Sequence, residues 1–331
     1  MTKLKEEKVN ILVTGGAGFI GSVFCSHLKK KYNNLFKIFV IDNLSSGNKK
    51  YLSCDKFYNI DLKNNLKLNN FFKKKKIDIV IHLAGYTNLR DLNPKKFYIN
   101  NFLATKNLIN ILIKFKVKKL IFSSTAAVYG NPSKIPISEF APTVPISHYG
   151  KSKLKAENYI KKKFKDNYKA IIFRFFNASG ANVVQKIGED KNPAEHLIPI
   201  ILRGFIKRKQ IKIFNSFNTF DGTGVRDYVH VEDIALAIMK AINNLRGMRK
   251  NYTILNLGSG KGISSLMILK KIETLLKNKM NYKFIPKRDG EPNILLSTIK
   301  KVKKKINWSP TKDINKILKD SIFWERYINN I

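Results

Sequence analysis

The stretch Val9-Asn-Ile-Leu-Val-Thr-Gly-Gly-Ala-Gly-Phe-Ile-Gly21 decides the fold. Its first six residues are nearly all apolar, as is typical of a buried parallel strand. Gly15, Gly18 and Gly21 follow with the spacing G-x-x-G-x-x-G and open an apolar segment that runs to about residue 31. Such glycines permit a tight turn, a close approach of diphosphate to the backbone, and close packing of helix on strand. The stretch therefore predicts strand, loop and helix, with a phosphate at the helix N-terminus.

The next apolar segment identifies the expected phosphate-bearing ligand. Residues 36–41 read as a second strand, and Asp42 closes it 21 residues after Gly21. A carboxylate at that place can accept hydrogen bonds from both hydroxyls of an adenosine ribose, and it would repel a 2′-phosphate. The order strand, glycine loop, helix, strand and acid therefore predicts NAD rather than NADP as the cofactor.

The alternation of strands and helices continues through the first half of the chain. Further strands are predicted at residues 57–60, 77–83, 118–124 and 170–175, with helices at 94–115 and 149–165. This order predicts an α/β fold with a doubly wound, Rossmann-like parallel sheet, whose ligands lie at the carboxyl ends of its strands. Gly15, Asp42, Gly85, Ser124 and Thr125 all fall at those ends, so they are expected to line one crevice.

The sequence changes character after residue 176. Residues 180–192 are polar and loop-like, helices are predicted at 193–208, 233–244, 266–277 and 311–327, and short strands at 211–214, 225–229 and 254–257. We therefore predict an NAD-binding domain over residues 8–176 and a smaller C-terminal α/β lobe over residues 177–331 that binds the substrate. Some exchange of chain between the two lobes is expected.

Tyr149 and Lys153 are the candidate catalytic pair. Four residues apart on a helix, they share one face. A nearby ammonium favours the phenolate and lowers the pKa of a tyrosine towards the range of a general base. A hydroxyl from Thr125 or Ser124, at the end of an apolar strand, can point into the same space. The pattern alone is weak, because Tyr and Lys are common in this chain and a solvated helix face would look the same.

The net charge of +40 permits two interpretations. A polyanion-binding surface is one. Compositional drift towards A+T-rich codons is the other, and it is favoured because only nine of the 63 basic residues are Arg and the lysines are spread over almost every segment. Nucleic acid is therefore not an expected partner, although acidic metabolites should be attracted.

Few other features suggest a special environment or a metal. There is no run of 18 apolar residues and no N-terminal signal-like segment, so no membrane association is expected. Cys25 and Cys54 have no disulfide or metal-ligand pattern, which fits a cytoplasmic protein. His82 and His230 have no partners at ligand spacing, so we interpret both as structural and expect no metal.

Longer stretches then identify a family. The chain resembles the UDP-glucose 4-epimerase family of the extended short-chain dehydrogenase/reductase superfamily over essentially residues 8–327. The most specific stretch is Asp221-Gly-Thr-Gly-Val-Arg-Asp-Tyr-Val-His230, which lies outside the cofactor half. Further matches are Thr14-Gly-Gly-Ala-Gly-Phe-Ile-Gly21, Phe122-Ser-Ser-Thr-Ala-Ala-Val-Tyr-Gly130, Arg174-Phe-Phe-Asn-Ala-Ser-Gly-Ala181, Ile187-Gly-Glu-Asp190, Glu195-His-Leu-Ile-Pro199 and Asn256-Leu-Gly-Ser-Gly260.

The resemblance implies an isomerase that interconverts UDP-galactose and UDP-glucose by transient oxidation at C4, with tightly held NAD regenerated in each turnover. It implies Tyr149 as the base, Lys153 as the residue that lowers its pKa and binds the nicotinamide ribose, and Thr125 beside the sugar O4, with Ser124 as the other candidate. It also implies a homodimer in which residues 94–115 and 149–165 form a four-helix bundle.

The resemblance also assigns binding residues. The cofactor-binding set is Gly15, Gly18, Phe19, Ile20, Gly21, Asp42, Asn43, Ser45, Ser46, Asp61, Leu62, Leu83, Ala84, Gly85, Asn100, Tyr149, Lys153 and Phe176. The substrate-binding set is Thr125, Asn177, His196, Leu197, Lys212, Ile213, Phe214, Arg226, Arg288, Glu291 and Leu295. Arg226 and Arg288 are assigned to the diphosphate, which suits the planar fork of an arginine.

Two departures from the family pattern leave the substrate open. Residues 86–91 replace a loop that typically carries a cofactor-contacting Lys, and Leu295 stands where strict members have a larger Tyr. A 4-epimerase of another UDP-sugar (N-acetylhexosamine, pentose or uronate) is therefore the alternative, and a non-catalytic NAD- or polyanion-binding protein is the distant one. A 4,6-dehydratase is disfavoured, because Ala126 and Ala127 occupy the places of its Asp-Glu pair.

Overall fold

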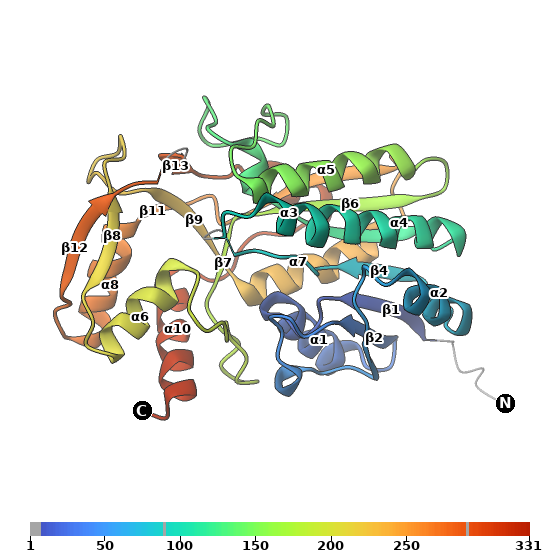
Figure 1. Cartoon of the computed structure of the whole chain (residues 1–331), viewed down its shortest axis with the longest axis horizontal. Helices are drawn as coiled ribbons and strands as arrows, with labels where there is room; N and C mark the ends of the chain where they lie inside the picture. The colour runs from blue at the N-terminus through green and yellow to red at the C-terminus, as the bar shows by residue number, and fades with distance from the viewer. Residues whose placement is uncertain (1–7, 89–90, 289–290) are drawn as a thin grey trace.

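A parallel sheet of seven described strands forms the centre of the molecule, in the order β10-β6-β5-β4-β1-β2-β3 (Figure 1). The computed structural model describes residues 8–88, 91–288 and 291–331. The strands are β1 (Val9–Thr14), β2 (Phe36–Asp42), β3 (Lys56–Asn59), β4 (Ile79–His82), β5 (Lys119–Thr125), β6 (Lys169–Phe175) and β10 (Tyr252–Leu257). The chain runs outward from β1 to β3 and then restarts at β4, so the order reverses between β1 and β4. This confirms the predicted doubly wound sheet, with a crevice at that switch point.

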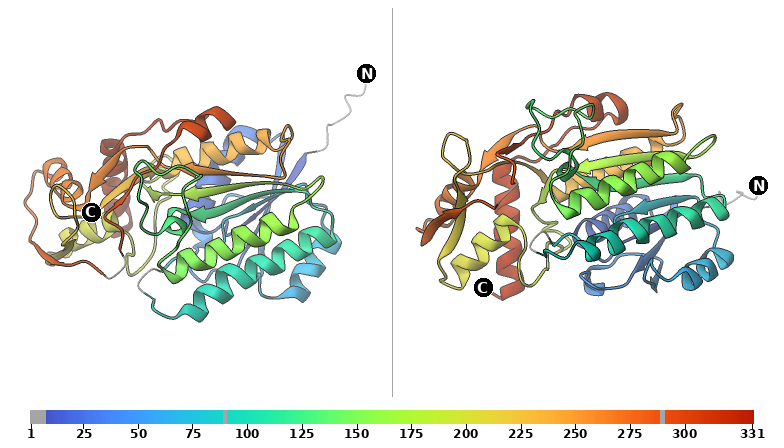
Figure 2. Two further views of the ribbon diagram at one scale, coloured as in Figure 1. Left: turned by 90° about the horizontal axis from the view of Figure 1, so that it is seen from above. Right: turned by 45° about the horizontal axis from the view of Figure 1, so that its top comes forward.

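Alternate residues of the buried strands face two separate helical layers. Ile11 and Val13 face one layer and Leu12 faces the other. The first layer contains α1 (Phe19–Tyr32), α7 (Val231–Asn244) and α9 (Lys300–Ile306), and the second contains α2 (Asn65–Lys74), α4 (Ala104–Lys114) and α5 (His148–Lys163). Helices α4 and α5 run side by side along the second face (Figure 2). Apolar surface on both faces of the sheet is thereby buried, which explains the nearly continuous apolar strands.

The segment predicted as one helix over residues 94–115 has three parts. Pro94 stands at the start of α3 (Pro94–Phe97), and the Asn93 side chain caps it. A π-helical stretch, η2 (Tyr98–Leu103), follows and leads directly into α4. Wider turns of this kind are rare and often occur at functional sites. Here the wide turn contains the buried Asn101.

A smaller lobe lies at the carboxyl edge of the sheet, on the left in Figure 1. In it, β8 (Ile211–Asn215) pairs with β12 (Tyr282–Pro286), and β9 (Val225–His230) pairs with β7 (Asn177–Ser179), β11 (Gly262–Ser264) and β13 (Ile294–Leu295). Its helices are α6 (Leu197–Ile206), α8 (Ser265–Leu276) and α10 (Ile314–Asn329), and they enclose a separate apolar core. Short single turns, η1 (Lys49–Tyr51) and η3 (Ala126–Tyr129), lie in loops at the same edge.

Residues beyond 176 contribute to both lobes. Strand β10 and helices α7 and α9 return to the seven-stranded sheet. The division at residues 176 and 177 stays a prediction. Strands β7, β11, β12 and β13 and helices α2 and α9 were not predicted. Helix α9 has the sequence KKVKKKI and buries only Val302 and Ile306, so it carries almost no apolar periodicity.

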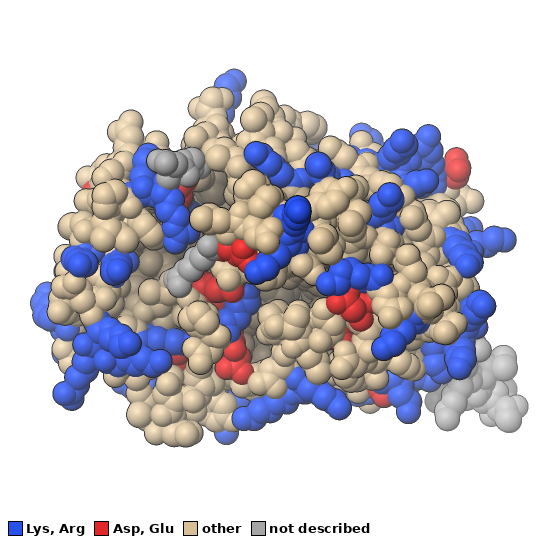
Figure 3. All heavy atoms as spheres, viewed as in Figure 1, with Lys and Arg blue, Asp and Glu red and all other residues tan. Residues whose placement is uncertain are grey.

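Basic side chains do not gather in one place on the face drawn in Figure 3. In Figure 3, Lys and Arg side chains are spread over the whole visible face, with few Asp and Glu between them. In the described part of the chain, no helix is both long enough and apolar enough to span a bilayer.

Candidate active site

The glycine loop joins β1 to α1 at the switch point of the sheet. Gly15 has φ +73°, and a Cβ there would lie 2.5 Å from the backbone nitrogen of Ala84, which follows β4. No larger residue fits so close to that backbone. Helix α1 begins after Gly18, which offers no side-chain cap, and its first turn holds no acidic residue. Its N–H groups are therefore available for an anion.

Asp42 ends the neighbouring strand β2 and points towards the glycine loop. One carboxylate oxygen accepts a hydrogen bond from the Ala17 N–H at 3.0 Å, and the other accepts one from the Leu44 N–H at 2.8 Å. Burial raises the pKa of Asp42, and the two backbone hydrogen bonds oppose that shift. Each oxygen keeps a lone pair, so the carboxylate can also accept hydrogen bonds from the hydroxyls of a ribose.

The other predicted cofactor residues line the same edge. Asn43 donates to Asp61 at 3.0 Å, and Asn100 accepts from Lys63 at 3.0 Å, while Lys63 pairs with Asp61 at 3.3 Å. Phe19 and Ile20 open α1, Ser45 and Ser46 follow β2, Leu62 follows β3, and Leu83, Ala84 and Gly85 follow β4. This edge therefore offers a helix N-terminus for phosphate, a carboxylate for ribose and polar side chains beyond the carboxylate. Together these groups fit a dinucleotide.

Tyr149 lies in the first turn of α5, close to the end of β5. The Ser147 side chain caps this helix by accepting from the Gly150 N–H at 3.1 Å. The Tyr149 phenol faces the hydroxyl of Thr125, the last residue of β5. Burial raises the pKa of Tyr149 to about 12, and the Thr125 hydroxyl acts in the opposite direction. The decrease in the Tyr149 pKa that the sequence led us to expect from Lys153 does not outweigh this effect of burial.

Lys153 lies one turn further along α5 and is only 3% exposed. Its ammonium donates to the Ser123 carbonyl at 2.8 Å and lies 5.0 Å from the centre of the Phe122 ring. Burial lowers the pKa of Lys153 to about 8, although Glu157 favours the charged form. A Cβ on Gly85 would lie 3.1 Å from this ammonium. The structure thus brings Lys153 beside the loop after β4, at the predicted cofactor site.

Ser124 has a different environment from Thr125. Its hydroxyl donates to Glu157 at 2.5 Å, and Glu157 also accepts two hydrogen bonds from Arg174, at 3.0 and 2.8 Å. All three side chains are buried. The Ser124 hydroxyl therefore binds the buried Glu157–Arg174 ion pair, and Thr125 supplies the hydroxyl beside Tyr149.

Asn101 is a site residue that the sequence reasoning missed. Its carbonyl oxygen accepts from the Tyr86 N–H at 2.6 Å, and its amide nitrogen donates to the Tyr86 carbonyl and the Ser152 hydroxyl, both at 3.0 Å. The wide turn η2 thus ties the loop after β4 to α5. The only sequence signal was a pair of Asn residues, 100 and 101, flanked on both sides by apolar and aromatic residues.

The loop that departs from the family pattern lies next to the catalytic pair. The ring of Tyr86 lies 5.2 Å from that of Phe97, which lies 6.3 Å from that of Tyr149. The Tyr86 hydroxyl donates to Asp91 at 2.6 Å, and Lys96 donates to the same carboxylate at 2.8 Å. Two members of this loop, residues 89 and 90, fall outside the described residues.

Arg226, Arg288 and Glu291 form the polar part of the smaller lobe's site. Arg226 donates to Glu291 at 3.2 Å, and the Arg288 guanidinium lies 4.7 Å from the centre of the Phe214 ring. The second carboxylate oxygen of Glu291 is buried and has no hydrogen-bond partner among the described residues. A buried acceptor without a protein partner is suited to accept a hydrogen bond from a hydroxyl of a ligand.

The remaining predicted substrate residues differ in what their side chains can reach. Asn177 pairs with Tyr228 in the small sheet, and Phe176 and Leu295 share one apolar cluster. The His196 side chain is 45% exposed and lies 2.7 Å from Glu189, whose carboxylate raises the pKa of His196. Leu197 opens α6, Lys212 is exposed, and Ile213 is fully buried in the lobe's core, so it can meet a ligand only through its backbone.

The described histidines, cysteines and acids form no cluster of three that could hold a metal ion. His82 is hydrogen-bonded to Thr14 at 2.7 Å and Thr105 at 2.9 Å, and burial, aided by Lys153, lowers its pKa to about 3. His230 bonds Asp320 at 3.0 Å.

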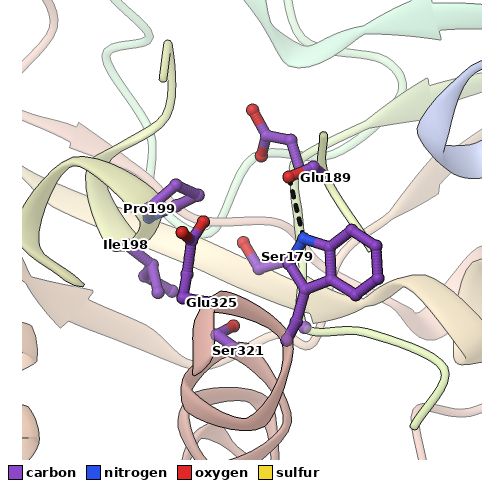
Figure 4. A pocket seen from close by; sticks show the side chains of 8 residues that line it. Ser179, Glu189, Ile198, Pro199, Ser321 and Glu325 are labelled. Carbon is purple, nitrogen blue, oxygen red and sulfur yellow. Dashed lines mark hydrogen bonds between the residues drawn. The ribbon is translucent and has the colours of Figure 1, made fainter. Parts of the chain in front are cut away.

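A small cavity lies away from this site, beside α10 (Figure 4). It measures about 10 Å³ and is lined by Ser179, Gly180, Glu189, Ile198, Pro199, Ser321, Trp324 and Glu325. The Trp324 ring donates to the Glu189 carbonyl at 2.9 Å across its wall. A space of this size holds about one water molecule, so we assign it no ligand.

Comparisons with known proteins agree with this geometry. Residues 11–258 match the family described as NAD dependent epimerase/dehydratase. A UDP-glucose 4-epimerase of Streptococcus mutans is 38% identical, with 95% of this chain and 96% of that protein covered. A crystal structure of UDP-glucose 4-epimerase from Bifidobacterium longum in complex with NAD⁺ and UDP gives a TM-score of 0.91 at 29% identity, covering 97% and 99% of the two chains. The UDP-Glc/GlcNAc 4-epimerase of Campylobacter jejuni gives 0.81 at 31% identity, covering 96% and 99%.

Proposed function

The chain belongs to the NAD dependent epimerase/dehydratase family, and we propose that it is a UDP-sugar 4-epimerase that interconverts UDP-galactose and UDP-glucose. The family resemblance expected from the sequence motifs is confirmed by this match. The observation that carries the proposal is the placement of the Tyr149 phenol beside the Thr125 hydroxyl, with Lys153 buried one turn away at the glycine-loop edge of the sheet. The similarity to the Streptococcus mutans enzyme over 95% of the chain supports the choice of reaction.

The residues present fit NAD, as the family requires. Gly15 and Gly18 leave room for the diphosphate at the start of α1, and Asp42 offers acceptors for the adenosine ribose. Lys153 lies where the loop after β4 meets the crevice, and it would hold the nicotinamide ribose. When bound, NAD takes up a hydride from a sugar carbon and returns it, which is chemistry that no protein side chain supplies.

Tyr149 is the proton acceptor in this proposal. With a pKa of about 12 the phenol is a weak acid, so it must be converted to phenolate by added positive charge. The cationic nicotinamide ring would supply that charge beside the Lys153 ammonium, which the site already contains. The Thr125 hydroxyl lies beside the phenol and can form a hydrogen bond with the sugar O4. The proton from O4 would then move to Tyr149 as C4 is oxidised.

The smaller lobe would hold the UDP part while the oxidised sugar turns over. Arg226 and Arg288 supply planar cationic forks for the diphosphate. The unpartnered oxygen of Glu291 is an acceptor suited to a hydroxyl of the uridine ribose. Tight binding of the UDP part by these residues would allow the sugar to be bound weakly and to rotate. Hydride could then return to the other face of its C4.

A second candidate substrate class is the N-acetylated UDP-sugars. Leu295 packs in the apolar cluster with Phe176, and it is smaller than a Tyr would be there. The similar Campylobacter jejuni protein is a UDP-Glc/GlcNAc 4-epimerase. We expect the wild-type chain to convert UDP-galactose to UDP-glucose and also to turn over UDP-N-acetylgalactosamine. A Leu295→Tyr variant should keep the first activity and lose the second. Equal loss of both would contradict this role for Leu295.

We further propose a cytoplasmic homodimer. Cys25 and Cys54 are free thiols, which fits a reducing compartment. Tyr98 and Ile99, at 40% and 39% exposure, present apolar surface on the helical segment that is expected to pair with a second copy. Sedimentation equilibrium that gives the mass of a single chain would refute the dimer.

The experiment that tests the proposed reaction is direct. Purified protein is incubated with UDP-galactose, and UDP-glucose is measured with a UDP-glucose dehydrogenase coupling enzyme. Approach to the same equilibrium mixture from either sugar supports a 4-epimerase. NAD found in the purified protein without any interconversion would instead favour the non-catalytic NAD-binding alternative.

A further inference from the structure

A short segment of the smaller lobe crosses the carboxyl edge of the large sheet. This segment, residues 189–196, is named here the crossing segment. Its Asp190 accepts hydrogen bonds from Asn48 at 3.0 Å and from Tyr51 at 3.1 Å, both in the loop that follows β2. Its Lys191 donates to Thr87, in the loop that follows β4, at 2.7 Å. The crossing segment therefore joins the two sides of the crevice that would hold the dinucleotide.

Lys191 is held firmly in place. Besides the bond to Thr87, its ammonium donates to Glu195 at 2.5 Å, and its side chain is 21% exposed. The Lys191 carbonyl accepts a hydrogen bond from Arg203, which is itself anchored by Glu325. An ammonium has three donors. Within the described residues two of them have partners, which leaves one N–H for a ligand.

The position of Thr87 places this ammonium near the expected cofactor. Thr87 follows Ala84 by three residues, and the backbone of Ala84 touches Gly15 of the glycine loop. Three residues span at most about 11 Å, so Thr87 lies within that distance of Ala84, whose backbone lies against the phosphate-binding turn. Residues 83–88 carry no cation of their own. Lys191 brings a positive charge to this loop from the opposite lobe.

We propose that Lys191 retains the cofactor: it bridges the two lobes across the crevice and donates its third N–H to an acceptor oxygen of the bound dinucleotide. The proposal rests on the NAD-dependent function given above and adds a residue outside the glycine loop, Asp42 and the Tyr149–Lys153 pair. It explains why a Lys–Glu pair lies across from Thr87 instead of pointing to solvent.

The test measures how long the protein keeps NAD. Lys191→Met removes the ammonium but keeps an unbranched apolar stem, and Thr87→Val removes one of the two side-chain partners of the ammonium and leaves Glu195 in place. Lys207→Met changes an exposed lysine at the end of α6 as the control. Each variant is loaded with NAD, passed through a desalting column and assayed for retained NAD after acid release. The rate of NAD loss is then followed by dilution.

Lys191→Met should lose NAD about tenfold faster than wild type, the effect of losing one charge-assisted hydrogen bond. Thr87→Val should lose it about threefold faster, because the ammonium is less well positioned. If Lys191→Met is unstable, Thr87→Val still provides the test in a chain that keeps Lys191. NAD loss at the wild-type rate in both variants would overturn the proposal. Failure of the epimerase function would show differently: wild-type protein with bound NAD and no interconversion of UDP-sugars.

Discussion

Replacement of Lys153 by Met should abolish epimerisation and yet stabilise the protein at neutral pH. Lys153 is 3% exposed, and burial lowers its pKa from 10.5 to about 8. Each pKa unit corresponds to about 1.4 kcal/mol, so the charged ammonium costs the native state about 3 kcal/mol at pH 7. Met removes that cost. It also removes the hydrogen bond to the Ser123 carbonyl, worth about 1 kcal/mol.

The net expected gain is therefore about 2 kcal/mol in the free energy of unfolding at pH 7, or about 4 °C in Tm for a chain of this size. The gain should depend on pH with a definite sign. Between pH 8 and 10.5 the unfolded wild-type chain holds a proton on Lys153 that the folded chain has released. Wild-type stability therefore rises with pH in this window. The difference in free energy of unfolding between the variant and wild type should therefore decrease by about 1 kcal/mol between pH 7 and pH 9.

The assay is urea unfolding of wild type, Lys153→Met and Lys151→Met at both pH values. Lys151 is exposed on the same helix, so its replacement should change stability little. A Lys153→Met variant that is less stable than wild type at pH 7 would refute the reasoning. So would a difference that stays constant between pH 7 and pH 9. Either result would mean that Lys153 is kept for structural support rather than for its charge.

Two further predictions concern arginines and their partners. Glu157→Gln should lower the free energy of unfolding by about 3–5 kcal/mol, because it leaves the buried Arg174 guanidinium without a counter-ion. A decrease of less than about 1 kcal/mol, measured by urea unfolding, would contradict this prediction. Arg226→Lys should raise KM for UDP-galactose about tenfold with a smaller effect on kcat, because a lysine cannot make the bidentate contact of a guanidinium. An unchanged KM in steady-state kinetics would show that Arg226 does not bind the diphosphate.

Local sequence signals predicted the large sheet well because its central strands are buried on both faces. Strands β1, β2, β5 and β6 are apolar runs bounded by polar residues and glycine, and their parallel arrangement followed from the alternation with helices. The smaller lobe was harder to predict. Strand β13 has only two residues, and β12 is mostly exposed, so neither carries a strong apolar pattern. Helix α9 is almost entirely lysine, and the π turn η2 leaves no mark in apolar spacing.

The candidate site shows the same limit. Gly15, Asp42 and the Tyr149–Lys153 spacing are local patterns, so their convergence at one edge could be expected from the parallel topology. The different environments of Ser124 and Thr125 could not, because they depend on Glu157, which is 33 residues from Ser124 in sequence. The raised pKa of Tyr149 could not be predicted from the sequence either, because burial opposes the effect expected from Lys153.

The most direct test of the account compares wild type with Tyr149→Phe in the conversion of UDP-galactose to UDP-glucose, with NAD content measured in both. The hydroxyl of Tyr149 is the group proposed to take the proton from O4, and its removal leaves the ring in place. We predict full retention of NAD and a fall in kcat of at least about 100-fold in the variant. A Tyr149→Phe variant that retains NAD and epimerises at the wild-type rate would contradict it.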